Sequence, residues 1–124
     1  MLPEQPLRIH VDCHYVPEHS DPAQHQYLFH YTITLRNITD SPLKLERRQW
    51  LITDGDGQQS QVEGPGVVGE TPTIAPGAQY RYTSSVLLPT PIGTMQGFYT
   101  LRCGSKEVRA VIDPFTLRQP GALH

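Results

Sequence analysis

The chain has 124 residues, enough for one domain with a hydrophobic core and too few for two. Hydrophobic residues make up 37% and charged residues 18%, a composition typical of globular rather than disordered proteins. The formal net charge of −2 argues against a general binder of polyanions, because such domains are usually clearly basic. We expect a single domain over residues 1–124, with a core at about 7–118 and short flexible tails.

The N-terminus and the cysteines indicate where the protein acts. The first residues, MLPEQPLRIHVDC, lack the charged segment and the apolar run of a signal peptide. No apolar run approaches the ~20 residues needed to span a bilayer. Cys13 and Cys103 are too few for a disulfide scaffold, and no C-x-x-C occurs. We therefore expect a cytoplasmic protein without membrane association, in which both cysteines are reduced and pack as small hydrophobes.

The first two predicted strands are residues 7–15 and 27–38, in which apolar and polar residues alternate. A period of two indicates half-buried strands of an antiparallel sheet. The apolar faces consist of Ile9, Val11, Cys13 and Tyr15 in the first segment and Tyr27, Phe29, Tyr31, Ile33 and Leu35 in the second.

Residues 43–53 form the third predicted strand, but its apolar residues change phase. Leu43 and Leu45 fall on one face and Trp50 on the other, so we expect a β-bulge near residues 47–49 to restore the register. The sequence Asp-Gly-Asp-Gly at 54–57 then favours a hairpin turn, and residues 58–63 return as a polar edge strand.

Three more strands follow at residues 78–88, 95–103 and 106–113, the last two joined at Gly104 and Ser105. About seven short strands predict an all-β protein, an antiparallel immunoglobulin-like sandwich, with a small closed barrel as the alternative. Trp50 suits the core of a sandwich. Because the paired cysteines of antibody domains are missing, the fibronectin type III-like version is the closer one.

The segment EGPGVVGE at residues 63–70 contains a complete G-x-G-x-x-G, formed by Gly64, Gly66 and Gly69. In a dinucleotide-binding unit this pattern opens a helix whose N-terminus holds a pyrophosphate. Here Pro72 and Pro76 follow too soon for a helix, and the acidic residue expected about 20 positions later is absent. The sequence excludes the dinucleotide-binding fold.

Two readings of the glycine segment stay open. Gly64, Gly66 and Gly69 could place free backbone amides around a phosphate, although the neighbouring acids Glu63 and Glu70 would repel it. Alternatively, the glycines allow positive φ angles in a loop between the sheets. Val67 and Val68 between them would then pack as a plug or present an apolar tip to a partner.

No pattern indicates a metal, a cofactor or a catalytic group. His10 and His14 share a strand face but would lie ~13 Å apart, too far for one metal ion. No G-x-S-x-G or other catalytic motif occurs, so we expect no catalytic residue and no enzyme activity. Arg47 and Arg48 beside Trp50 are weak evidence for nucleic-acid binding, which we do not expect.

Several segments resemble the ApaG family closely, and together they cover nearly the whole chain. The resemblance is carried by Tyr15–Ser20 (YVPEHS), Tyr27–Ile33 (YLFHYTI), Trp50–Gly57 (WLITDGDG), Val62–Pro72 (VEGPGVVGETP), Ala75–Gly77 (APG), Tyr80–Ser84 (YRYTS), Leu88–Tyr99 (LPTPIGTMQGFY) and Pro114–Leu117 (PFTL).

The resemblance implies a fibronectin type III-like sandwich and a G-x-G-x-x-G loop for which a phosphate-binding role has been proposed. It also implies an association with cobalt tolerance and magnesium efflux, and with an operon that encodes a dinucleoside tetraphosphatase. Related domains are fused in F-box proteins and in a protein that binds DNA polymerase delta, which implies protein–protein recognition.

We therefore expect a non-enzymatic binding module that recognises a protein partner. Val67, Val68, Arg47 and Arg48 are the candidate partner-binding residues. The alternatives are a pyrophosphate or nucleotide ligand held by Gly64, Gly66 and Gly69, or a bound divalent cation.

Overall fold

The computed structural model describes residues 5–122. Strand-forming and turn-forming residues alternate along the chain, and the structure consists of strands with two short 3-10 helices between the first two of them. The elements are β1 (Leu7–Tyr15), the 3-10 helices Pro17–His19 and Pro22–Gln24, β2 (Tyr27–Asn37), β3 (Leu43–Asp54), β4 (Gln59–Pro65), β5 (Thr73–Ile74), β6 (Gln79–Leu88), β7 (Ile92–Cys103) and β8 (Lys106–Arg118).

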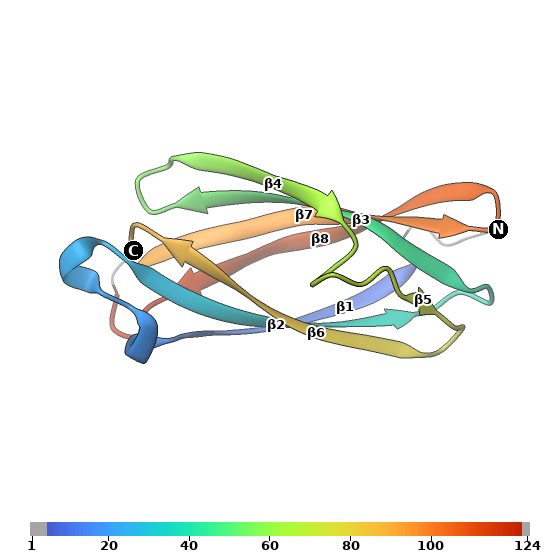
Figure 1. Cartoon of the computed structure of the whole chain (residues 1–124), viewed down its shortest axis with the longest axis horizontal. Helices are drawn as coiled ribbons and strands as arrows, with labels where there is room; N and C mark the ends of the chain where they lie inside the picture. The colour runs from blue at the N-terminus through green and yellow to red at the C-terminus, as the bar shows by residue number, and fades with distance from the viewer. Residues whose placement is uncertain (1–4, 123–124) are drawn as a thin grey trace.

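These strands form two antiparallel sheets that pack face to face (Figure 1). One sheet has the order β1-β2-β6, and the other has the order β4-β3-β7-β8 with β5 paired to β3. The predicted all-β sandwich is confirmed. The prediction of about seven strands missed the two-residue β5, which is too short to show a period of two.

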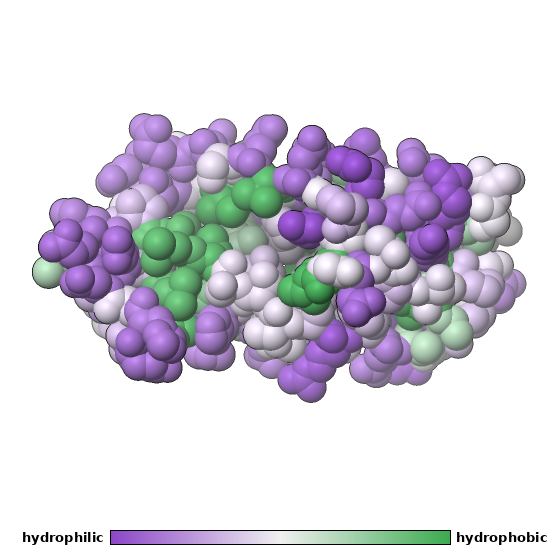
Figure 2. Space-filling view, in the orientation of Figure 1, coloured by the Kyte–Doolittle hydropathy of each residue, from purple (hydrophilic) through white to green (hydrophobic). Residues whose placement is uncertain are grey.

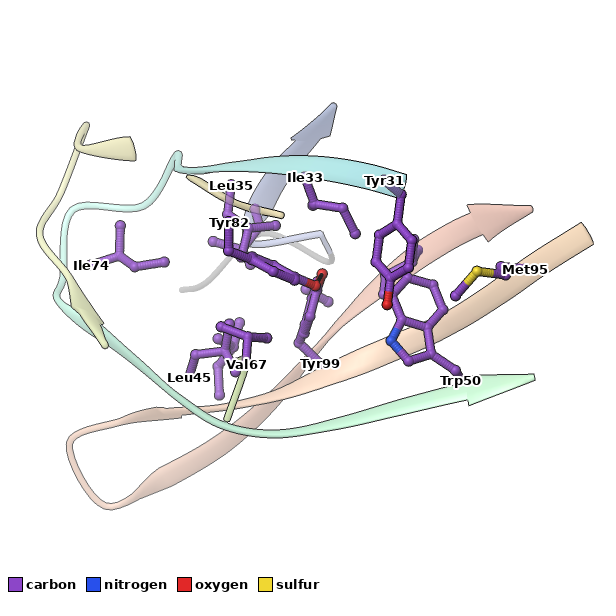
Figure 3. Close-up of a cluster of buried hydrophobic side chains, with 14 of the residues drawn as sticks. Tyr31, Ile33, Leu35, Leu45, Trp50, Val67, Ile74, Tyr82, Met95 and Tyr99 are labelled. Atoms are coloured by element: carbon purple, nitrogen blue, oxygen red, sulfur yellow. Dashed lines mark hydrogen bonds between the residues drawn. The ribbon is translucent and has the colours of Figure 1, made fainter. Parts of the chain in front are cut away.

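The core lies between the sheets, where the alternating apolar residues of both meet. Figure 3 shows part of it, with side chains of β2 and β6 reaching those of β3 and β7. The buried apolar residues include Phe29, Tyr31, Ile33 and Leu35 of β2, Leu43, Leu45 and Trp50 of β3, Tyr82 and Leu88 of β6, Met95, Tyr99 and Leu101 of β7, and Ala110, Ile112 and Leu117 of β8.

The phase change in β3 is real, but the bulge lies earlier than predicted. The register against β7 shifts between Leu45 and Arg47, not at residues 47–49. Because Glu46 is the extra residue, Leu45 and Arg48 both face the other sheet while Arg47 faces solvent. The last strand is also longer than predicted, since a second bulge lets β8 continue past Asp113 to Arg118.

The two long edges of the sandwich differ. On one side β1 and β8 approach each other, and the Sγ of Cys13 donates to the carbonyl of Thr116 over 3.3 Å. Near this side, the Gln5 side chain donates to the carbonyl of Val111 over 2.8 Å and accepts from its amide over 2.9 Å. On the other side, β4 and β6 are the edge strands of their sheets (Figure 1).

The expected flexible tails fall partly on residues 1–4 and 123–124, which lie outside the described residues.

Within residues 5–122 no helix has the length and apolar character needed to cross a bilayer.

Candidate functional site

The glycine segment forms a tight loop that leaves β4 at Pro65. Val67 and Glu70 exchange two backbone hydrogen bonds of 2.8 Å, which closes a two-residue turn. Its central residues, Val68 and Gly69, have φ angles of 41° and 80°, the positive values that a type I′ turn requires. Gly66 precedes the turn with a φ of 55°, whereas Gly64 belongs to β4. Only two of the three motif glycines therefore adopt a left-handed conformation.

The loop uses most of its backbone amides internally. The amide of Gly66 donates to the carbonyl of Glu46 over 2.8 Å, and those of Val67 and Glu70 bind each other's carbonyls. The side chain of Arg48 also binds the loop, since its Nη1 donates to the carbonyls of Pro65 and Gly66 over 3.0 and 3.1 Å. An anion nest needs several free amides aimed at one point. This geometry supports a loop whose glycines serve its shape.

We predict that ATP, GTP and pyrophosphate bind this loop with dissociation constants above roughly 1 mM, or no more than about −4 kcal/mol. The amides of Gly66, Val67 and Glu70 are already occupied, and Glu63 and Glu70 add negative charge. Amide NMR spectra recorded during nucleotide addition measure this directly. Saturating shifts confined to residues 64–70 at micromolar ligand would contradict the prediction.

The structure separates the four candidate partner-binding residues into two kinds. Val67 is fully buried and plugs the core beside Leu45 (Figure 3), whereas the side chain of Val68 is 53% exposed at the tip of the loop. Arg47 is exposed on the outer face of β3, and Arg48 is half-buried between the sheets. Val68 and the two arginines are therefore the ones whose side chains a partner could reach.

A groove of about 420 Å³ runs between β4 and β6, and the glycine loop lies at one end of it. Figure 2 shows hydrophobic residues gathered along this groove. The groove is within the size range of sites for small ligands or inserted side chains. Its lining includes Arg48, Trp50 and Val62 on one sheet and Tyr31, Ser84 and Val86 on the other.

The floor of the groove holds an unsatisfied donor. Trp50 is only 2% exposed, and its Nε1–H is buried with no hydrogen-bond partner among the described residues. Its indole lies beside the ring of Tyr31, with the ring centroids 5.7 Å apart (Figure 3). A buried N–H without an acceptor costs about 1–3 kcal/mol. A buried water is the usual acceptor for such a group.

Deeper in the core, the hydroxyls of Tyr82 and Tyr99 form a hydrogen bond of 2.5 Å (Figure 3). Burial raises the pKa of both phenols strongly, and the charge of Arg48 opposes the rise. Burial also raises the pKa of Tyr31, against a hydrogen bond with Ser84 and the charge of Arg48. The charge of Arg48 thus lowers the pKa of all three phenols, against the larger effect of their burial.

Sequence reasoning missed Tyr31, Trp50 and Ser84 as residues of the candidate site. All three lie on the inward faces of their strands, and alternation assigns such residues to the core. No sequence signal distinguishes an inward residue at an open sheet edge from one covered by a neighbouring strand.

The histidines of β1 are spread apart. The Nε2 of His10 lies 3.8 Å from Oδ2 of Asp12, and both side chains are more than 70% exposed. His14 packs edge-on against His30, with the ring centroids 5.5 Å apart. Among residues 5–122 no group of three His, Cys, Asp or Glu side chains lies together in a way that could hold a metal ion.

Replacing His10 and His14 together by alanine should leave the affinity for cobalt nearly unchanged. Two exposed side chains at separate points of one strand do not chelate a common ion. Isothermal titration of the wild type and the double variant with CoCl₂ measures the difference. A tenfold or larger loss of affinity would show that the two histidines do share a metal.

Both cysteines are free thiols, but the prediction that both pack as small hydrophobes is wrong for Cys13. Cys13 is exposed at the β1–β8 edge, while Cys103 is half-buried against the core. Desolvation, followed by the charge of Asp12, raises the pKa of the Cys13 thiol. The neutral thiol is therefore favoured, which disfavours a role as a nucleophile.

These features define an all-β protein of the fibronectin type III-like sandwich class, with a groove along one open edge. Over residues 17–103 the chain matches the family described as the ApaG domain. It is 50% identical over 119 residues to Protein ApaG of Shewanella frigidimarina, covering 95% of this chain and 94% of that relative. It is 48% identical over 120 residues to Protein ApaG of Shewanella piezotolerans, covering 96% and 95%.

A solved structure agrees with these sequence matches. A protein from Bordetella pertussis described as ApaA is 42% identical and superposes with a TM-score of 0.90, covering 97% of this chain and 100% of that one. The chain belongs to the ApaG family. Neither this family membership nor the all-β fold points to an enzyme.

Proposed function

We propose that this chain is a non-catalytic binding module of the cytoplasm that recognises another protein through the glycine loop and the groove beside it. The observation that carries the proposal is the conformation of Val68. A β-branched residue at positive φ is a genuine outlier, and here it is exposed rather than packed. The strain costs about 1–2 kcal/mol. Strain of this kind is concentrated at functional sites.

The surroundings of Val68 make it a suitable contact. Val67 anchors one side of the turn in the core, and Arg48 fixes its base through two hydrogen bonds. A rigid loop loses little conformational entropy on binding, and its apolar tip buries surface against a partner. We propose that any link of this chain to cobalt tolerance or magnesium efflux runs through that partner.

The test is site-specific photo-cross-linking in cells, with the cross-linking amino acid at position 68. Val111 of β8 is the matched control, because its side chain is 56% exposed on a different face. We expect a defined protein to be cross-linked from position 68 and not from position 111. The same products from both positions would overturn the proposal.

A second variant separates the tip from the fold. Val68→Asn introduces a residue that tolerates positive φ and removes the apolar side chain, so it should raise the free energy of unfolding by roughly 1 kcal/mol. With the cross-linker at Arg47, beside the loop, the same substitution should reduce partner cross-linking. Undiminished cross-linking from a well-folded variant would show that Val68 takes no part in recognition.

A further inference from the structure

The guanidinium of Arg48 crosses beneath β4 at Gly64. A Cβ at Gly64 would lie 3.1 Å from Nη1, so the missing side chain makes room for the charged group. Arg48 reaches past its own strand toward the open edge of the sheet, where it binds two carbonyls. Among residues 5–122 no carboxylate lies within ion-pair distance of it. A half-buried guanidinium of this kind favours a carboxylate, with which it forms strong charge-assisted hydrogen bonds.

β4 presents a free edge next to the guanidinium of Arg48. Within the described part of the chain, β4 pairs with β3 on one side only. The amide of Asp54 donates to the carbonyl of Gln58, and the amide of Gly66 donates to the carbonyl of Glu46. In an antiparallel pair, hydrogen-bonded residue pairs alternate with pairs that are not hydrogen-bonded. The backbone N–H and C=O groups of Gln59, Gln61 and Glu63 therefore point away from β3. β4 has no internal proline or lysine of the kind that guards an edge strand.

The residues of β4 between these positions face the groove. Ser60, Val62 and Gly64 pair with Ile52, Trp50 and Arg48, and paired residues share a face of the sheet. A strand added to the edge of β4 would direct every second side chain into the same groove. There it would meet the charge of Arg48 in a groove that Trp50 helps to line.

We propose that an extended segment of the partner protein adds to the edge of β4 and places an acidic side chain in the groove, against Arg48. The idea rests on the proposed function and specifies the kind of segment recognised. The backbone bonds to Gln59, Gln61 and Glu63 supply a sequence-independent contact, as in other cases of strand addition. Arg48 supplies the preference for an acid, and Val62 and Val86 accept apolar neighbours.

The probe is the blocked peptide acetyl-Val-Thr-Glu-Thr-Val-amide, in which the glutamate and both valines share a face. Two matched peptides replace the glutamate by glutamine or by leucine. Because the chain contains one tryptophan, its single indole N–H resonance reports on the groove. We expect a dissociation constant on the order of 1 mM for the acidic peptide, with shifts of the indole and of the amides of residues 59, 61 and 63. The two uncharged peptides should bind at least threefold more weakly.

A charge at Val62 provides a second, independent measurement. This side chain is 41% exposed on the groove face of β4, so a polar substitution leaves the core intact. Val62→Lys should tighten binding of the acidic peptide by about threefold, and Val62→Asp should weaken it by a similar factor. Circular dichroism and thermal melts of both variants check the fold.

The outcomes separate this inference from the function on which it rests. Equal binding of the three peptides, no shift at about 10 mM, or shifts that avoid β4 would each overturn the acidic-segment inference. Partner cross-linking from position 68 would still stand in that case. Conversely, loss of the cross-link with retained acidic-peptide binding would remove Val68 from the recognition site and leave the groove in place.

Discussion

Replacing Gly66 with alanine should lower the free energy of unfolding by roughly 2–4 kcal/mol. Two causes act together: Gly66 has a φ of 55°, and an added Cβ would collide with the carbonyl of Glu70. That carbonyl accepts the hydrogen bond from Val67, so moving it opens the turn and withdraws the buried valine from the core. Urea unfolding measures the change.

The other two glycines of the motif are the controls. Gly69 has a φ of 80°, but a Cβ there would meet no atom within 4 Å, so Gly69→Ala should cost about 1–2 kcal/mol from backbone strain alone. At Gly64 φ is unstrained, and a Cβ would press only on the flexible end of Arg48. Gly64→Ala should therefore be the mildest of the three. Equal losses in all three variants would contradict this account of the loop.

Raising the pH from 8 to 11 should lower the free energy of unfolding by about 3 kcal/mol through Tyr82 and Tyr99 alone. An unfolded tyrosine has a pKa near 10, whereas burial raises the folded pKa of both well above that value. At pH 11 each phenol is ionised in the unfolded chain and protonated in the folded one. A pKa raised by folding gives stability that is fully present below the unfolded pKa, and the loss begins as the pH exceeds about 10.

Urea unfolding at several pH values, with phenolate absorbance as a second probe, measures the effect. The double variant Tyr82→Phe/Tyr99→Phe removes both hydroxyls and their 2.5 Å hydrogen bond together, which avoids leaving one of them unpaired. Its stability should fall less steeply above pH 10 than that of the wild type. An equal slope in the two proteins would assign the alkaline loss to other groups.

The extent to which the fold follows from the sequence is clearest in β2 and β3. In β2 the strict alternation predicts the buried face, and Phe29 through Leu35 are buried at every second position as expected. In β3 the phase change predicts a bulge but not its place, because the extra residue is selected by pairing with β7. Its position at Glu46 decides that Arg48 turns inward while Arg47 stays in solvent. The sequence of two adjacent arginines does not indicate which of them faces the other sheet.

The candidate site depends on contacts between distant segments. The proline spacing after Gly69 correctly excludes a helix, and the loop indeed leads into β5 without one. Cys13 shows the limit of the same reasoning, since alternation gives the face of a residue but not whether the opposite sheet covers it. The groove likewise arises because β4 and β6 end their sheets on the same side, a property of topology rather than of local sequence.

The two hydrogen bonds between Gln5 and Val111 affect which edge of the sheet can pair with another strand. The primary amide of Gln5 offers the donor and acceptor that an incoming strand would offer, and it occupies both backbone groups of Val111. β8 is thereby capped at this point, and β1 covers the same side. An edge strand whose backbone groups are already bonded does not template pairing with another chain. In the β4-β3-β7-β8 sheet, the edge is therefore closed at Val111 of β8, whereas β4 keeps its outward backbone groups unpaired within the described part of the chain.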